Sequence, residues 1–398
     1  MLFRWSFLLY RMSINILLFR RDKIIITPVN SFIILFYLAL NAFTFNIYAQ
    51  EYIKFNEELV IGEELSSRKE LLFARPNFIV TDSKGAIYIS ELVDKTIRKF
   101  DKNGSYLFSF GRRGKGPGEF QDITVFSINN GDTLIIADQF LYRISFFSTD
   151  GKYLNAIKMN PQEMLWPRKI LQLNSGDYIL GYKMENEPEI FHIYNSSFTQ
   201  KVNSFGKDAV VIHDNPYVDS AAVIIFRGKI AVLKNNDILY SPFLYDGNIY
   251  YYKSILNKQW KLKYKIKGFL ESKNPYLDIN PNIKKYDHSD PPWSFKGYNS
   301  GNSYAAVLMN ESRGLFILNN GNIINFTLIK HGGYREFGFD LFNKNGSFMK
   351  HYFMYKEKLR TDMPTDIPIY VEWKDKNDNF YFKDLTGYPK IKKIKIIF

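Results

Sequence analysis

The chain has 398 residues, no cysteine, a formal net charge of +13 and an aromatic content of 17%. The absence of cysteine excludes disulfide frameworks, Cys-ligated metal sites and a Cys nucleophile. A content of 46% hydrophobic and 23% charged residues excludes a disordered or collagen-like chain. The surplus of Phe and Tyr favours strands, because flat rings pack well on a pleated surface.

The first fifty residues predict an export signal. A basic cluster that ends at Lys23 precedes an apolar run over residues 32–45, which is shorter than the ~20 residues of a membrane-spanning helix. We expect residues 1–49 to be a signal peptide cleaved after Ala49, with an uncleaved N-terminal membrane anchor as the alternative. Residues 50–398 then carry 48 basic and 39 acidic residues, a charge of +9.

Three later segments repeat a pattern of strand, Asn-Gly or Asp-Gly turn, and strand. These dipeptides supply the positive φ angles of tight turns and therefore indicate β-hairpins. The segments are residues 97–111, 144–157 and 339–353. Further hairpins begin near residues 77, 123 and 169, and a four-stranded unit that recurs every ~40–50 residues is typical of a β-propeller blade.

The repeats predict an all-β fold, a six-bladed β-propeller of four-stranded antiparallel blades. The predicted blades are residues 77–110, 123–157, 168–205, 230–266, 304–353 and 369–397. The last blade shows only three strands, and we expect residues 52–61 to supply its outer strand and so close the ring. Two inserts, residues 207–227 and 268–301, interrupt the repeats, and the second lacks strand periodicity.

The connection Phe110-Gly-Arg-Arg-Gly-Lys-Gly-Pro-Gly-Glu-Phe120, together with residues 76–90 and 100–104, resembles an NHL repeat. The match is to the six-bladed propeller family common among exported proteins of Bacteroidota-type bacteria. This resemblance implies the fold and an exported location in a Gram-negative bacterium: periplasmic, cell-surface or secreted. It implies no single activity, because the family includes binding modules, sensor domains and a few lyases or lactonases.

The sequence offers no catalytic set, metal ligands or cofactor motif. The glycine-rich connection lacks the Gly-Lys-Ser/Thr and the helix of a phosphate-binding loop, so we expect a tight connection with Phe120 packed between blades. The five histidines show no metal-ligand spacing. Carboxylates at strand ends (Glu91, Asp94, Asp138, Asp177) are expected to cap turns rather than to pair as acid and base.

These observations predict an extracytoplasmic binding or interaction module whose partner is a glycan, a peptide or an envelope protein, and not a nucleic acid. Its ligand face would consist of loops at residues 91–96, 112–118, 139–142, 185–189, 244–247 and 384–388, together with the two inserts. The alternatives are a metal-dependent propeller lyase or lactonase, and a structural component of a surface complex. The candidate ligand-binding residues are Glu91, Asp94, Lys95, Arg112, Arg113, Lys115, Gln139, Tyr142 and Arg143.

Overall fold

The structure, a computed structural model, is built from β-strands throughout its described part. It describes residues 53–160, 167–182, 187–209, 228–255, 258–270, 294–299, 302–307, 310–331, 334–358 and 369–398. Within these ranges there is no α-helix, only the short 3-10 turns η1 (Lys69–Leu71) and η2 (Lys207–Ala209). The predicted leader lies outside the described residues, as do the loop at 210–227 and most of the second insert.

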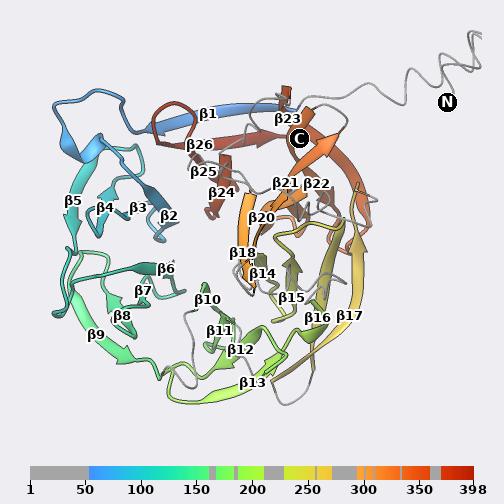
Figure 1. Cartoon of the computed structure of the whole chain (residues 1–398), viewed down its shortest axis with the longest axis horizontal. Helices are drawn as coiled ribbons and strands as arrows, with labels where there is room; N and C mark the ends of the chain where they lie inside the picture. Colours follow the sequence, from blue (N-terminus) through green and yellow to red (C-terminus); the bar gives the residue numbers. More distant parts are fainter. Residues whose placement is uncertain are drawn as a thin grey trace, which may run out of the picture. The chain divides into compact units, whose positions relative to one another are not determined.

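Six four-stranded antiparallel sheets form a ring, as Figure 1 shows. Blade one is β2 (Pro76–Thr81), β3 (Ile87–Glu91), β4 (Thr96–Phe100) and β5 (Tyr106–Phe110). Blade two is β6 (Ile123–Ile128), β7 (Leu134–Asp138), β8 (Arg143–Phe147) and β9 (Tyr153–Lys158). Blade three is β10 (Lys169–Gln172), β11 (Tyr178–Gly181), β12 (Phe191–Tyr194) and β13 (Lys201–Phe205).

The second half of the ring repeats this order, with the first strand of each blade innermost. Blade four is β14 (Lys229–Val232), β15 (Ile238–Ser241), β16 (Asn248–Ile255) and β17 (Gln259–Lys267). Blade five is β20 (Asn310–Ile317), β21 (Ile323–His331), β22 (Tyr334–Phe342) and β23 (Phe348–Lys358). Blade six contains β24 (Ile369–Lys374), β25 (Asn379–Asp384) and β26 (Lys390–Ile397).

The strand β1 (Lys54–Ile61) completes blade six and closes the ring. It pairs antiparallel with β26, from Lys54 opposite Ile397 to Ile61 opposite Ile391. The blue and red strands therefore lie side by side in Figure 1. This confirms the predicted closure, and it removes the open edge that β26 would otherwise present.

The hairpin turns form where the Asn-Gly and Asp-Gly pairs predicted them. Gly104, Gly151 and Gly346 have φ angles of 86°, 79° and 83°, a region in which a side chain would be strained. The residue three positions earlier organises the turn in blade one, where the Asp101 carboxylate accepts the backbone N–H groups of Asn103 (2.9 Å) and Ser105 (2.8 Å). Local chemistry thus specifies the outer hairpins of these blades.

Hydrophobic cores lie between neighbouring blades, and the described residues form six such clusters, one at each interface. Between blades one and two, Phe120 is fully buried and its ring centroid lies 5.7 Å from that of Phe147. Between blades five and six, Phe326 packs edge-on against Phe380 at 5.1 Å. The position expected for Phe120 is confirmed, and large aromatic rings fill the wedge between blades.

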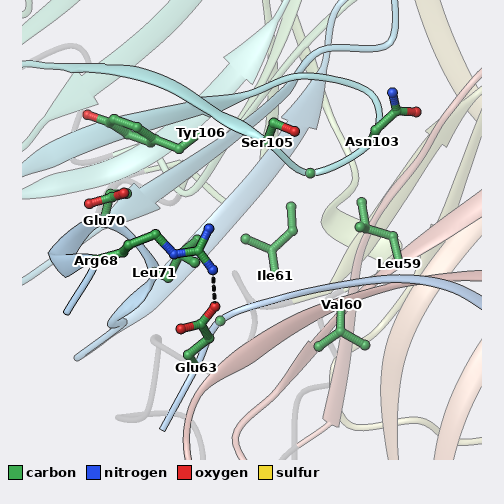
Figure 2. A pocket seen from close by; sticks show the side chains of 12 residues that line it. Leu59, Val60, Ile61, Glu63, Arg68, Glu70, Leu71, Asn103, Ser105 and Tyr106 are labelled. Atoms are coloured by element: carbon green, nitrogen blue, oxygen red, sulfur yellow. Dashed lines mark hydrogen bonds and ion pairs between the residues drawn. The ribbon is translucent and has the colours of Figure 1, made fainter. Parts of the chain in front are cut away.

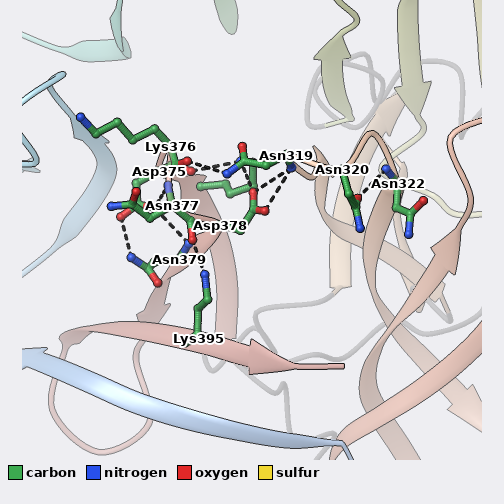
Figure 3. A network of polar contacts seen from close by, with 10 residues as sticks. Asn319, Asn320, Asn322, Asp375, Lys376, Asn377, Asp378, Asn379 and Lys395 are labelled. Atoms are coloured by element: carbon green, nitrogen blue, oxygen red, sulfur yellow. Dashed lines mark hydrogen bonds and ion pairs between the residues drawn. The ribbon is translucent and has the colours of Figure 1, made fainter.

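Hydrogen bonds between polar groups join neighbouring blades at the turns between their first and second strands. At the interface of blades five and six, the Asn319 backbone N–H donates to Asp378 Oδ2 (3.0 Å) and its Nδ2 donates to the Lys376 carbonyl (2.7 Å), as drawn in Figure 3. Lys376 Nζ in turn donates to the Ser83 carbonyl of blade one (2.6 Å). The same kind of contact joins the following pairs: Ser83 with Asp132, Asn130 with Gln172, and Asn174 with Asn236.

Blade five differs from the prediction. Its inner strand begins at Asn310, whereas Tyr304 belongs to β19 (Asn302–Val307), which pairs with β18 (Ser294–Asn299) in a separate two-stranded sheet. The insert expected to lack strands therefore contains one complete strand, β18, and its partner β19 begins directly after the insert. The misassignment arose because β20 opens with a polar run that does not read as a buried strand, although Glu311 and Arg313 are buried and pair at 2.8 Å.

Candidate functional site

Four of the six inner strands carry a β-bulge, either at their start or near their middle. The register shifts between Pro76 and Ile79 in β2 and between Ile123 and Val125 in β6. It also shifts around Arg313 in β20 and around Glu372 in β24. A bulge inserts an unpaired residue and re-aims its side chain, so residues that interrupt the regular alternation of these strands can point toward the axis of the ring.

Five charged residues meet around this axis, and we call them the axial cluster: Lys169, Lys229, Arg313, Glu372 and Lys383. Lys169 and Lys229 are the first residues of the inner strands β10 and β14. Arg313 and Glu372 are the bulged residues of β20 and β24. Lys383 lies on β25, directly opposite Tyr370 of β24.

Glu372 is the centre of the axial cluster. Its carboxylate lies 3.2 Å from Lys383 Nζ and 3.9 Å from Lys229 Nζ. Lys383 also donates to Asn77 Oδ1 (3.0 Å) of blade one, and its Nζ lies 4.9 Å from the ring centroid of Tyr370. The guanidinium of Arg313 stacks over the same ring at 4.1 Å. One aromatic ring and one carboxylate therefore organise the cations of several blades.

The contacts of the axial cluster span the ring. Lys229 belongs to blade four and Glu372 to blade six, so their ion pair joins two blades that are not neighbours in the ring. Lys169 belongs to blade three, which is opposite blade six, and the charges of Glu372 and Lys383 still act on the pKa of Lys169. Side chains from opposite blades can interact only if they approach the axis, and Lys169 and Lys229 lie where their inner strands begin, so the cluster lies near the axis at that end of the ring.

Burial and mutual repulsion set the protonation of this cluster. Burial lowers the pKa of Lys229 to about 7, helped by the nearby Lys169, Lys383 and Arg313 and opposed by Glu372. Burial also lowers the pKa of Lys169. For Glu372, burial acts to raise the pKa, but the surrounding ammonium groups outweigh it and hold the pKa at about 2. The carboxylate of Glu372 is therefore ionised. Its single negative charge does not balance the positive charges of the three lysines around it.

The sequence candidates lie elsewhere at this end of the ring, in the loops of blades one and two. Glu91 is fully buried, and its carboxylate accepts the backbone N–H groups of Ala74, Arg75 and Val93 at 2.9–3.0 Å. Asp138 serves the same purpose in blade two, where it accepts the Gln121 N–H at 2.6 Å. The turn-capping interpretation is confirmed for these two carboxylates.

The remaining sequence candidates bind one another and the local backbone. Asp94 pairs with Arg98 at 3.0 Å, and Lys95 lies 3.4 Å from Asp122, to which Gln139 also donates. Arg112 pairs with Glu119 at 2.7 Å but keeps 78% of its side chain exposed.

The last four candidates lie along the same seam between blades one and two. Arg113 donates to the Val93 carbonyl at 3.3 Å, and Arg143 donates to the carbonyls of Lys115 (3.0 Å) and Gly116 (2.7 Å). Tyr142 adopts a left-handed backbone, with φ 48°. The structure thus brings the nine candidates together between two blades, away from the axial cluster, and their role in ligand binding stays a prediction.

The described histidines have structural surroundings. His192 is buried, its Nδ1 lies 2.8 Å from Ser204 Oγ, and burial lowers its pKa to about 4. His351 Nδ1 lies 2.6 Å from Asp340 Oδ1, beside the stacked ring of Phe269. Among the residues that the structure describes, no group of three or more His, Asp or Glu side chains is placed to hold a metal ion.

A hollow of about 390 Å³ lies at the seam between β1 and blade one, as Figure 2 shows. Its wall includes Leu59, Ile61 and the turn at residues 103–106, and an ion pair between Arg68 and Glu63 crosses its mouth. Arg68 is 62% exposed, so the hollow lacks the buried, convergent polar groups of a specific small-molecule site. The axial cluster has such groups and is the better candidate.

Sequence reasoning did not find the axial cluster, since its members come from four blades. The signal in the chain is a charged residue at the start or inside an otherwise apolar inner strand, as in Lys169-Ile-Leu, Lys229-Ile-Ala-Val and Tyr-Val-Glu372-Trp. No linear motif joins the five members, because they are spread over four repeats.

In the described ranges, no helix has the length and apolar character needed to span a bilayer. No curated protein matches the sequence. The ring is similar to solved structures of an exported protein from Bacteroides fragilis (TM-score 0.51, 12% identity, 87% of this chain and 95% of that one) and of a DUF4221 family member from Bacteroides vulgatus (TM-score 0.52, 10% identity, 87% and 99%).

A likeness to virginiamycin B lyase from Staphylococcus aureus is weaker, with a TM-score of 0.42, 10% identity and coverage of 86% and 100%, and it has no bearing on function. At these identities the solved structures speak for the fold alone. The family model of DUF5128, a six-bladed β-propeller, matches residues 64–308, which is more than half of the chain. The chain therefore belongs to the DUF5128 family of six-bladed β-propellers.

Proposed function

We propose that this chain is an extracytoplasmic binding module that takes its ligand on the axis of the ring, at the end where the inner strands begin. The ligand is a glycan, a peptide or part of an envelope protein. The observation that carries the proposal is the axial cluster, in which charged groups from blades three to six converge on one place.

Burying such a cluster of charges lowers the stability of the fold, so its presence suggests a functional role. Taking an ion out of water costs several kcal/mol, and a buried ion pair often adds no net stability compared with apolar residues. Glu372 and Lys229 keep only 12% and 14% of their side chains exposed. Charged groups that are kept buried at such a cost, and that converge from several blades, are typical of functional sites.

The loops at the same end offer apolar contact area. Phe140, in the turn between β7 and β8, is 64% exposed, and Val93, in the equivalent turn of blade one, is 50% exposed. An exposed aromatic side chain beside polar groups suits a sugar or peptide, because it supplies contact area at a low entropic cost. A ligand held on the axis would extend over these turns.

The predicted leader and a similar solved protein support an extracytoplasmic location. An apolar run of 14 residues behind a basic cluster has the form of an export signal, and the similar protein from Bacteroides fragilis is described as exported. The mature protein would therefore meet envelope glycans and peptides. Mass spectrometry of the mature protein tests the leader: a first residue at Gln50 supports cleavage, and one upstream of residue 32 argues against it.

The binding site is tested with arrays of envelope glycans and peptides. Labelled wild-type protein should bind defined members of an array, Lys383→Met should lose this binding at least tenfold, and Lys152→Met should retain it. Lys152 is the matched control because it lies in an exposed hairpin turn of blade two. The proposal fails if the axial variant binds as well as wild type, or if a divalent metal converts the bound compounds to products.

A further inference from the structure

Two ammonium groups of the axial cluster have no hydrogen-bond partner among the described residues. Lys169 takes part in no hydrogen bond or ion pair there, and Lys229 has only the ion pair with Glu372, whose 3.9 Å is beyond hydrogen-bond distance. An ammonium carries three N–H donors. Both groups are largely removed from bulk water, so within the part of the chain that the structure describes their N–H donors are not used by the protein.

The local charge is unbalanced in the same direction. Arg313 pairs with Glu311 at 2.8 Å. The other members, Lys169, Lys229 and Lys383, place three positive charges around the single negative charge of Glu372, which leaves a formal charge of +2 when all are ionised. Glu372 is already committed to Lys383 at 3.2 Å. Lys383 is also satisfied by Asn77, so Lys169 and Lys229 carry the unmet charge.

We propose that Lys169 and Lys229 hold an oxyanion of the ligand, a carboxylate or a sulfate or phosphate ester, on the axis of the ring. This inference rests on the proposed binding function and specifies the chemistry of its ligand. An oxyanion offers several acceptor oxygens to two ammonium groups at once and offsets part or all of the +2 charge, depending on its own charge. Hydrogen bonds between an ammonium and an anionic oxygen are about twice as strong as neutral ones.

Neutral and cationic ligands fit this site less well. A cation would meet the two uncompensated ammonium groups, and a neutral ligand would leave their charge unbalanced at low local dielectric. The flexible lysine side chain behaves as a movable point charge, so the site accepts carboxylate and tetrahedral oxyanions alike. The ring of Tyr370, which contacts both Arg313 and Lys383, lies beside the site.

The inference is tested by calorimetric titration of the full chain with sodium sulfate and with sodium glucuronate. Both anions keep a fixed charge near neutral pH, and glucose serves as the neutral control. We expect wild-type protein to bind at least one of the two anions and not glucose. Sulfate binding more tightly would indicate an ester-type anion, and glucuronate binding more tightly would indicate a sugar acid. Binding of neither anion overturns the inference.

Variants locate the site. Lys169→Met and Lys229→Met should each weaken anion binding at least tenfold, because each removes a charged donor. Lys152→Met, with the same substitution on the rim, should bind like wild type. Undiminished binding in both axial variants would place the anion elsewhere and refute the assignment. Thermal unfolding of each variant confirms that it is folded before titration.

A measurement on the wild-type protein needs no variant. Lys229 faces Glu372 of β24, Lys169 of β10, Lys383 of β25 and Arg313 of β20, and its pKa of about 7 means that it is partly neutral in the empty site. A bound anion stabilises the charged form, so binding takes up a proton. Affinity should fall roughly twentyfold between about pH 6.5 and about pH 8.5, as the protonated fraction of Lys229 falls.

Proton uptake is read from titrations in two buffers with different heats of ionisation. Equal heats in the two buffers, or an affinity that does not change with pH, would contradict the assignment of Lys229. The two proposals fail separately. If array ligands require Lys383 but sulfate and glucuronate do not bind, the binding module stands and the oxyanion inference falls.

Discussion

Asp138 should be among the most sensitive positions for stability at the end of the ring that we assign to ligand binding. It ends β7, is only 1% exposed, and its carboxylate accepts four backbone N–H groups. Two come from the connection into blade two, Gln121 at 2.6 Å and Asp122 at 3.1 Å. Two come from the following turn, Phe140 and Leu141, both at 3.0 Å.

The substitution Asp138→Ala removes all four acceptor contacts. A hydrogen bond to a charged group contributes about 1.5–3 kcal/mol, and a buried N–H without an acceptor costs about 1–3 kcal/mol. The four bonds share one carboxylate and part of the connection is open to water, so the terms do not add in full. We expect the free energy of unfolding to fall by about 3–5 kcal/mol. Asp138→Asn keeps one oxygen and should lose about half as much.

The assay is urea unfolding followed by tryptophan fluorescence, with Asp101→Ala as the matched control. Asp101 also caps a turn through two backbone N–H groups, but near the surface, and its loss should cost about 1 kcal/mol. Asp138→Ala that remains folded should bind sulfate like the wild type, since the carboxylate of Asp138 accepts hydrogen bonds from backbone N–H groups. A loss below 1 kcal/mol, or a selective loss of anion binding in the folded variant, would refute this reasoning.

Three further outcomes are expected. Removal of residues 54–61 should lower the thermal unfolding midpoint and promote association through the exposed edge of β26; an unchanged midpoint would contradict ring closure. Lys229 has a pKa of about 7 in the fold against about 10.4 when unfolded, so the unfolded chain binds the extra proton between these values and stability rises with pH. In Lys229→Met the free energy of unfolding should rise less steeply with pH, by up to about 1.4 kcal/mol per pH unit. An identical pH dependence of urea unfolding in the variant and the wild type would argue against the lowered pKa of Lys229. Asn319→Ala should cost about 1 kcal/mol by breaking the contact to the Lys376 carbonyl, whereas exposed Asn345→Ala should change the urea midpoint little.

The ring could be predicted because its information is local and repeated. Asn-Gly and Asp-Gly turns, such as those at Gly104 and Gly151, determine hairpins without help from distant residues. The closing strand was predictable for a related reason, since blade six showed three strands and needed a fourth. The start of blade five was predicted too early, at Tyr304. The charged residues of β20 can be buried because Glu311 pairs with Arg335 of β22, and this partner is 24 residues away in the sequence.

The axial cluster could not be predicted from the sequence, because the information that specifies it is not local. Lys169 and Glu372 are separated by half of the ring and are brought together only by its closure. The β-bulge that re-aims Glu372 is a feature of pairing between β24 and β25, and no local pattern announces it. The charged loop residues of blades one and two were easier to notice, yet Glu91 binds backbone groups of its own blade and Arg143 binds the backbone of the connection between the two blades.

Closure of the ring through β1 also has a kinetic meaning. Lys54 pairs with Ile397, so the contact joins positions 397 − 54 = 343 residues apart. Bringing such distant points together costs on the order of 5 kcal/mol in loop entropy for an otherwise unfolded chain. Adjacent blades are joined by much shorter connections, and their hairpins form without this penalty. The first strand to be synthesised should therefore be the last to dock, and the seam beside β26 should be where the assembled ring first opens.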